Sequence, residues 1–338
     1  MNLLSGLYGR AARFRRAWYR RRADRVRQLA RPVISVGNLV VGGSGKTPVV
    51  AAIAQLLLAA GERPAILSRG YGRRRSADGV VVVSDGQSIL VSAYESGDEP
   101  LMLARALPGV PVLVSPDRYV AGRLAERQFG CTVHLLDDGF QHVQLGRAVD
   151  LLVMSRDDLH ESVLPAGRLR EPLEAAQEAD ALLVSGSERD AADMAARIGV
   201  NPVFRLLTRQ GGARLMSDGR PPAAGRRVVA VAGIARPERF FAALRANGWD
   251  VASEIAFRDH HWYSARDLAT IARTSAEVGA DMVVTTEKDA ARLEGTDVAG
   301  AQTPWAAVPL HMTIEPGSFM SWLQDRLRAA RHRGTEAA

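Results

Sequence analysis

The sequence predicts an α/β protein made of two α/β/α domains, the larger one built on a doubly wound parallel sheet. Short runs of β-branched and apolar residues alternate along the chain with stretches rich in Ala, Leu and Arg, which are typical of helices. Several short runs are apolar at nearly every position, as expected for strands buried on both faces of a parallel sheet. A segment rich in Gly, Pro and Arg, residues 208–227, interrupts the alternation and indicates a second domain beyond it.

The chain length agrees with two domains, since 338 residues exceed the size of one typical hydrophobic core. The expected organisation, in chain order, is a basic amphipathic helix (1–31), a larger domain (32–207), a small two-stranded linker or hairpin (208–227), a smaller α/β domain (228–325) and a disordered tail (326–338).

Each element is expected from its local pattern. The expected strands of the larger domain are 33–37, 65–68, 80–83, 110–114, 133–136, 149–154 and 181–184. Those of the smaller domain are 228–232, 282–285 and 307–310. The expected helices between them are 49–60, 117–129, 188–198, 236–247 and 264–279.

The positive charge of the chain is concentrated at its N-terminus. Residues 1–31 hold ten arginines against one acid, Asp24, whereas the whole chain has a net charge of +7, so the remainder is close to neutral. The single cysteine, Cys131, cannot form a disulfide within the chain, which suits a reducing compartment. No apolar stretch approaches the ~20 residues that a membrane-spanning helix needs.

The N-terminal segment has the pattern of a basic amphipathic helix. Its apolar residues at helical spacing are Leu4, Leu7, Tyr8, Ala11, Phe14 and Trp18, and the arginines expected on the opposite face are Arg10, Arg13, Arg16 and Arg20. Such a helix is expected to lie in an anionic membrane surface. The alternatives are a charged helix packed on its own domain or a transit peptide, although nothing indicates cleavage. Nucleic-acid binding is not expected, because no recognised nucleic-acid fold accompanies the helix.

The stretch "VISVGNLVVGGSGKTPVV", residues 33–50, joins an expected strand to an expected helix through a glycine cluster. Backbone N–H groups of such a loop can surround a phosphate, and the helix N-terminus adds positive potential. Lys46 can reach the β- and γ-phosphates, and the Thr47 hydroxyl can bind Mg²⁺. Val40 stands where the usual motif has its first glycine, so a tight turn before Lys-Thr is the alternative. A P-loop is favoured because lysine occurs only at 46 and 288 in this arginine-rich chain.

A second acidic motif ends an expected strand, in "CTVHLLDDGFQH", residues 131–142. P-loop enzymes place an Mg²⁺-binding Asp at the carboxyl end of such a strand, which favours Asp137 and Asp138 over a simple Asp-Gly turn. The loops "SGDEP" (96–100) and "LPAGRLREP" (164–172) are ambiguous alone. The stretch "FRDHHWYS" (257–264) is not expected to bind zinc, because no second Cys/His cluster exists at metal spacing.

The motifs taken together resemble the tetraacyldisaccharide 4′-kinase family, the lipid A 4′-kinases. Seven motifs appear in order between about Leu3 and Leu310: "PVISVGNLVVGGSGKTP", "LSRGYGRR", "SGDEP", "DDGFQH", "LPAGRLREP", "FRDHHWY" and "VVTTEKDAARL". The extended glycine loop is itself this family's form of the motif. The resemblance implies transfer of the γ-phosphoryl group of ATP to the 4′-hydroxyl of a tetraacyl glucosamine disaccharide 1-phosphate. It also implies ATP bound at the domain junction and a peripheral location on the cytoplasmic face of the bacterial inner membrane.

The resemblance also implies roles for individual residues. The ATP-binding loop would comprise Val40, Val41, Gly42, Gly43, Ser44, Gly45, Lys46 and Thr47. Asp98 would be the general base and His260 its partner across the domain gap. Mg²⁺ would be bound through Thr47, Asp137, Asp138 and Glu171. The positions near the acceptor or the phosphates would be Arg69, Tyr71, Arg118, His142 and Arg170.

The sequence departs from the family pattern at residues 146–150 and 158–163, which bears on loops near the acceptor more than on the ATP site. Two other functions stay open from the residues alone. One is a P-loop nucleotide switch or metal-insertion chaperone, and the other is a membrane-surface module with a degenerate glycine loop. The kinase hypothesis implies no obligate protein partner.

Overall fold

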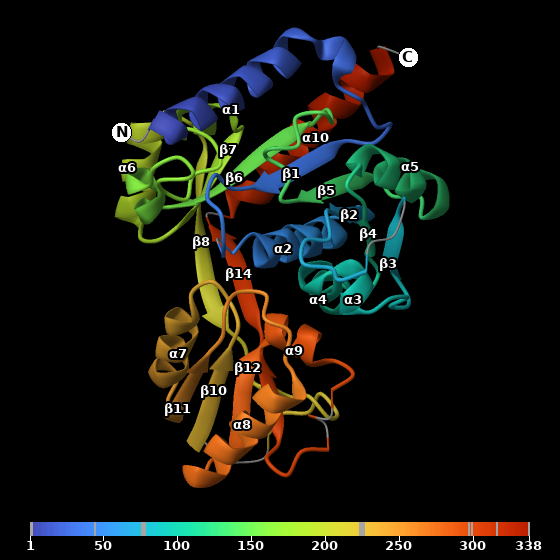
Figure 1. Ribbon diagram of the computed structural model, residues 1–338. Coiled ribbons are helices and arrows are strands. Elements are labelled where there is room, and N and C mark those ends of the chain that lie inside the picture. Colours follow the sequence, from blue (N-terminus) through green and yellow to red (C-terminus); the bar gives the residue numbers. More distant parts are fainter. Residues whose placement is uncertain are drawn as a thin grey trace.

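The computed structural model describes residues 3–336 except 44, 76–78, 223–226, 297, 299 and 316. It has the expected α/β architecture, with a larger domain and a smaller one joined by two long strands (Figure 1). The first helix, α1 (Leu3–Arg21), lies across the outside of the larger domain.

The larger domain contains a nine-stranded sheet in the order β14-β8-β7-β6-β1-β5-β2-β4-β3. Its strands are β1 (Val33–Gly37), β2 (Pro64–Ser68), β3 (Val81–Asp85), β4 (Pro111–Val114), β5 (Val133–Asp137), β6 (Val149–Ser155), β7 (Ala181–Ser185), β8 (Val203–Gln210) and β14 (Leu310–Glu315). All pairs are parallel except β3 with β4 and β14 with β8, which lie at the two edges. The carboxyl ends of the parallel strands therefore form one rim of the sheet.

Helices cover both faces of this sheet. On one face pack α2 (Lys46–Ala59), α4 (Asp98–Ala106) and α10 (Ser318–Glu336); on the other pack α5 (Arg118–Gln128) and α6 (Glu188–Ile198). Short helical segments complete the domain: α3 (Ala93–Ser96), η1 (Ala23–Arg25), η2 (Arg156–His160) and η3 (Leu173–Glu178). Neighbouring positions of a strand belong to opposite cores: Ile66 faces α2, while Leu67 packs with the residues around α5.

The smaller domain contains a five-stranded sheet in the order β11-β10-β12-β13-β9. Its strands are β9 (Arg214–Leu215), β10 (Arg227–Ala232), β11 (Asp250–Ala256), β12 (Met282–Thr286) and β13 (Trp305–Val308). Helix α7 (Pro237–Ala246) packs on one face, and α8 (Ala265–Glu277) with the end of α9 (Glu287–Leu293) packs on the other. This domain is thus also an α/β/α sandwich.

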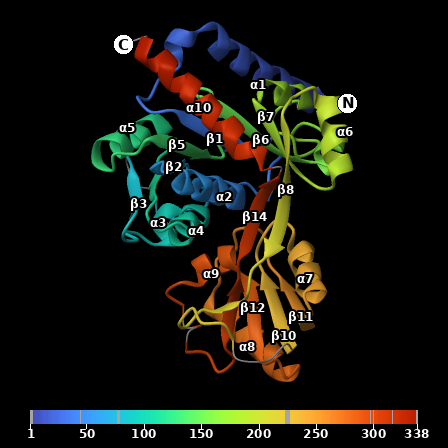
Figure 2. The same ribbon diagram turned by 180° about the vertical axis from the view of Figure 1, so that it is seen from behind.

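The connection between the domains differs from the hairpin expected at 208–227. The two-stranded element is the antiparallel pair β8–β14, in register from Arg205 opposite Glu315 to Gln210 opposite Leu310. Both strands run from one domain to the other, as the two opposite views show (Figures 1 and 2). The described part of 208–227 instead contains the end of β8 and the edge strand β9, which pairs with β13.

The chain returns to the larger domain after β14, so two boundary expectations were wrong. The smaller domain does not extend to 325, and residues 326–336 are not a disordered tail but the continuation of α10. The reason is a helical repeat of apolar side chains, Phe319, Leu323 and Leu327, which are buried in the core of the larger domain.

Helix α1 confirms the helix expected at the N-terminus. The side of the helix that packs on the larger domain, however, is not the apolar side. Its buried residues are Ser5, Gly9 and Arg16, whereas Leu3, Leu4, Leu7, Tyr8, Phe14 and Trp18 are exposed. The expectation that Arg16 lies on the outer charged face was therefore wrong. Among the residues that the structure describes, no helix has both the length and the apolar character needed to cross a bilayer.

Candidate functional site at the domain junction

The glycine loop leaves the carboxyl end of β1 at Gly37 and leads into α2. A side chain at Gly37 would collide with Phe140, since a Cβ there would lie 2.6 Å from the Phe140 backbone nitrogen. The loop ends at Gly45, whose φ of 75° is left-handed, and Lys46 begins the helix. The Lys46 ammonium donates to Asn38 Oδ1 at 2.8 Å and lies 3.4 Å from Asp138 Oδ1. The loop thus places the Lys46 ammonium close to Asp138 at the end of β5.

The loop is hydrogen-bonded to the segment that contains Arg168 and Arg170. The Val41 N–H donates to the Arg168 carbonyl at 2.8 Å, and the Arg168 guanidinium donates back to the Val41 carbonyl at 2.9 Å. A Cβ on Gly43 would lie 3.2 Å from the Cβ of Ala235, so the smaller domain approaches the loop closely. Ser44 lies outside the described residues.

Two carboxylates stand at the end of β5 in different electrostatic surroundings. Asp137 is buried; its Oδ2 accepts from the Ser68 hydroxyl at 3.2 Å, and its Oδ1 has no partner among the described residues. Burial, with the charges of Glu99 and Asp138, raises the pKa of Asp137 to about 7. Asp138 is also desolvated, but Lys46 and Arg170, whose NH1 is 2.7 Å away, outweigh this and lower its pKa.

A cationic cluster lies beside these carboxylates. Burial and the neighbouring charge of Arg69 lower the pKa of Arg118 to about 10. Burial and the charges of Arg118 and Arg147 lower the pKa of His142 to about 4. The Arg118 Nε and the His142 Nε2 are buried and have no partner among the described residues. The Arg118 Nε–H is a buried donor, and such donors are usually satisfied by a ligand or by water, so the cluster fits a bound anion.

The Asp98 and His260 side chains meet across the domain junction. Asp98 begins α4 in the larger domain, directly after Gly97, where a Cβ would lie 2.6 Å from the Tyr71 carbonyl oxygen. His260 Nδ1 lies 3.0 Å from Asp98 Oδ2, although 162 positions separate the two residues. The Tyr71 ring packs edge-on against His260 with centroids 5.2 Å apart.

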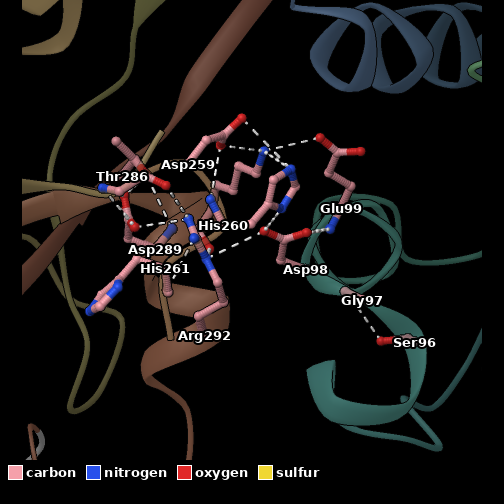
Figure 3. A network of polar contacts seen from close by, with 12 residues as sticks. Ser96, Gly97, Asp98, Glu99, Asp259, His260, His261, Thr286, Asp289 and Arg292 are labelled. Carbon is pink, nitrogen blue, oxygen red and sulfur yellow. Dashed lines mark hydrogen bonds and ion pairs between the residues drawn. The ribbon is translucent and has the colours of Figure 1, made fainter. Parts of the chain in front are cut away.

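Asp98 is almost fully buried. The side chains of His260 and Arg292 point toward its carboxylate (Figure 3). Burial raises its pKa, but the hydrogen bond from His260 and the charges of Lys288 and Arg292 outweigh burial, so the pKa of Asp98 is lowered. Arg292 Nε is 3.3 Å from Asp98 Oδ2, and Lys288 Nζ is 3.2 Å from His260 Nε2. The roles of Arg292 and of Lys288 were not predicted, although the rarity of lysine had singled out Lys288.

Backbone strain marks the same site. Among the described residues other than glycine, those with positive φ are Asp138, at 56°, and His260, at 58°. Such conformations cost free energy and persist where the surrounding structure enforces them, as in active sites.

Glu171 does not join the other expected Mg²⁺ residues. Its carboxylate accepts from Arg16 Nε of α1 at 2.8 Å in a buried ion pair. The same guanidinium donates to the Phe140 carbonyl at 3.1 Å, so α1 fixes the loop that follows Asp138. No group of three or more His, Cys, Asp or Glu side chains that could hold a metal occurs among the described residues. Mg²⁺ does not require one, because it is commonly bound through one or two side chains plus phosphates and water.

A cavity of about 300 Å³ lies beside Thr47 at the start of α2. Its walls come from both domains and from the connecting strands, and include Met102 of α4, Glu287 of α9 and Met312 of β14. The junction between the two domains therefore holds this cavity, the glycine loop, the cationic cluster and the Asp–His pair.

Comparisons with known proteins agree on one family. The chain matches the family described as tetraacyldisaccharide-1-P 4′-kinase over residues 1–328. Curated relatives named tetraacyldisaccharide 4′-kinase from Geobacter metallireducens and Geobacter sulfurreducens are each 46% identical over 86% of this chain, covering 87% and 82% of their own lengths. The solved structure of LpxK from Aquifex aeolicus in complex with ATP is 34% identical, with a TM-score of 0.77 over 96% of this chain and 97% of that one. The similarity thus extends far beyond the glycine loop.

We expect Asp137→Asn to stabilise the protein at high pH when nucleotide and metal are absent. The raised pKa means that folded Asp137 keeps a proton up to about pH 7 that the unfolded chain releases near pH 4. Stability from that proton is present at low pH and lost as the pH rises through this window. The variant lacks the charge, so its Tm should exceed that of the wild type by a few degrees at about pH 8 and equal it near pH 4.

Thermal unfolding at several pH values measures this difference. Asp218→Asn, at an exposed carboxylate of the smaller domain, is the matched control and should leave the pH dependence unchanged. A wild type that is as stable as Asp137→Asn at every pH would contradict the burial argument.

Proposed function

This chain belongs to the tetraacyldisaccharide-1-P 4′-kinase family, and we propose that it transfers the γ-phosphoryl group of ATP to the 4′-hydroxyl of a tetraacyl glucosamine disaccharide 1-phosphate. The product is the 4′-phosphate of the lipid A precursor. The observation that carries the residue roles is the meeting of Asp98 and His260 beside the glycine loop. Glu99, which follows Asp98 in α4, is one of the charges that raise the pKa of Asp137, and this supports treating the Asp–His pair and the β5 carboxylates as one site.

The nucleotide phosphates would be bound by the backbone of loop 40–47 and by Lys46, and the cavity beside Thr47 offers room for the nucleoside. Mg²⁺, when bound, would neutralise charge on the transferred group. Its proposed protein ligands are Thr47, Asp137 and Asp138. Asp137 is favoured because its buried Oδ1 has no partner among the described residues. We leave out Glu171, because Arg16 occupies its carboxylate.

Asp98 is the proposed general base for the sugar hydroxyl. A hydroxyl is a weak nucleophile, and a positioned carboxylate that accepts its proton contributes about 10²–10⁴-fold in rate. The cations around Asp98 keep it ionised at neutral pH but also make it a weak base, so its alignment by His260 matters more than its basicity. Arg69, Arg118 and His142 form the proposed anion site, with Arg170 holding Asp138 and Tyr71 supporting His260.

The rival function, a nucleotide switch or chaperone, does not account for this Asp–His pair. A switch needs a phosphate loop and a partner surface, whereas it has no use for a base aligned across two domains. Family membership over the whole chain favours the kinase as well.

The outer face of α1 supports attachment to an anionic membrane surface, which we place at the cytoplasmic face of the inner membrane. The side chains of Phe14 and Trp18 are exposed on α1, and Arg10, Arg13 and Arg20 are exposed along the same helix. Apolar side chains beside arginines are typical of interfacial helices. The proposed acceptor is acylated and would lie in the membrane, so attachment would bring the enzyme to it. The proposal requires no protein partner.

The kinase assignment is tested by mixing the pure protein with γ-labelled ATP and tetraacyl-disaccharide 1-phosphate. We expect label on the lipid, and Lys46→Ala should reduce kcat by about 10³-fold or more, because that cation faces the phosphates. Label that appears only as free phosphate, with no labelled lipid, would favour the nucleotide switch.

The Asp98–His260 pair is tested by a double-mutant cycle. Asp98→Asn and His260→Gln should each lower kcat about 10²-fold or more, and the double variant should be little worse than the poorer single variant. His261→Gln is the matched control, because that imidazole contacts Asp267 and stacks on Phe257 instead. Losses that multiply in the double variant would show that the two residues act independently.

Membrane attachment is tested with vesicles that contain anionic phospholipid. Phe14→Ser with Trp18→Ser should weaken binding, and a triple Gln substitution of Arg10, Arg13 and Arg20 should weaken it and flatten its salt dependence. Arg16 is kept, because it holds the site loops from inside. The matched control is a triple Gln substitution of exposed arginines in the smaller domain, Arg245, Arg266 and Arg273.

Both α1 variants should hydrolyse or transfer phosphate at an unchanged rate with a detergent-solubilised acceptor. Vesicle binding that equals the wild type in both variants would mean that α1 serves only to cover its own domain.

A further inference from the structure

Lys288, the second of the two lysines, lies at the domain junction and makes three polar contacts. Its Nζ is 3.2 Å from Glu99 Oε1, 3.4 Å from Asp259 Oδ1 and 3.2 Å from His260 Nε2. The side chain is mostly buried. Burial lowers its pKa, but the charges of Glu99, Asp98 and Asp259 outweigh burial and raise the pKa of Lys288, so it is an ammonium.

An ammonium has three N–H donors and no acceptor. Its third contact, His260 Nε2, must therefore accept a hydrogen bond, and a ring nitrogen that accepts carries no proton. The proton of neutral His260 then lies on Nδ1, which faces Asp98 Oδ2 at 3.0 Å and donates to it. Lys288 thereby selects one tautomer of the imidazole.

The two oxygens of Asp98 become different as a consequence. Oδ2 accepts from His260 and lies 3.3 Å from Arg292 Nε, whereas Oδ1 accepts from the Glu99 N–H at 2.9 Å. A carboxylate oxygen can accept two hydrogen bonds. Oδ1 therefore keeps one lone pair that can accept a hydrogen bond from a hydroxyl group.

We propose that Lys288 is a positioning residue for phosphoryl transfer: it holds His260 neutral with its proton on Nδ1, so that Asp98 is fixed through Oδ2 and presents Oδ1 to the acceptor hydroxyl. The inference rests on the roles proposed above for Asp98 and His260. Lys288 acts through His260 and does not touch the reacting atoms.

The groups that face His260 determine what its removal does. Asp98 and Glu99 come from α4, Asp259 from its own loop, Lys288 and Arg292 from α9, and Tyr71 from the loop after β2. Without Lys288 the nearby carboxylates outnumber the cation Arg292, and Nε2 loses its donor. No donor then holds Nε2 as an acceptor, so the Nδ1–H tautomer of His260 should no longer be favoured.

The experiment is a histidine-ring ¹H–¹⁵N NMR titration of the full-length protein, with the His260 signal identified by its loss in His260→Gln. In the wild type at neutral pH we expect the neutral Nδ1–H tautomer. In Lys288→Met the Nδ1–H tautomer should no longer dominate, because Nε2 has lost its donor. The kcat at neutral pH should fall about tenfold or more, with a greater loss at low pH than at high pH, and KM for ATP should be unchanged.

Two further variants separate positioning from a loss of structure. Lys288→Arg keeps a cation and should retain the tautomer and most of the pH profile. Arg273→Met removes an exposed cation from α8 of the same domain and should change neither measurement. Thermal unfolding checks that each variant is folded.

An Nε2–H tautomer in the wild type would overturn the inference, as would a Lys288→Met variant that loses kcat equally at every pH with an unchanged spectrum. If the spectrum changes as expected but Asp98→Asn keeps full kcat, the proposed base is wrong and the positioning role falls with it. If Asp98→Asn is inactive while Lys288→Met matches the wild type in spectrum and kcat, only the Lys288 inference fails.

Discussion

The buried contact of Arg292 with Asp98 is the interaction on which the site depends. Arg292 belongs to the smaller domain, where it also contacts Asp289 Oδ1 and the Gly233 carbonyl, both at 2.9 Å. Asp98 belongs to the larger domain, and neither side chain is more than 2% exposed. A buried charge is costly unless it is paired. Moving the domains apart would leave both groups without this partner, so the ion pair favours the arrangement in which His260 reaches Asp98.

The fold could be predicted where the signal is local. Buried parallel strands such as β1, β5 and β6 are mostly apolar, and the helices between them follow from periodicity. The connecting pair β8–β14 could not be found in this way. Its strands are separated by about 100 residues, and β8 mixes buried apolar positions with exposed Thr208 and Arg209, which resembles a loop. The pairing of β8 with β14 is a tertiary effect that no short window contains.

The site residues also fall into those that local motifs predict and those that depend on contacts between distant parts of the chain. Lys46, Thr47 and the two carboxylates at the end of β5 were predicted from motifs, because a glycine loop and a strand end carry their geometry within a few residues. Asp98 and His260 were expected only from the family resemblance, since 162 positions separate them. Arg16 was placed on the wrong face of α1, because its ion pair with Glu171 depends on a loop that the helix pattern does not reveal. Family resemblance supplied the long-range contacts that local patterns lack.

Several buried polar groups without described partners lie where the substrates are proposed to bind. Asp137 Oδ1, Arg118 Nε and His142 Nε2 are all buried, and each such group costs about 1–3 kcal/mol when it is left unsatisfied. Two of them are complementary to the proposed substrates, since a carboxylate oxygen suits Mg²⁺ and the Arg118 Nε–H suits a phosphate oxygen. Binding energy of the substrates can therefore relieve a cost that the folded protein already carries, which couples ligand binding to the order of the junction.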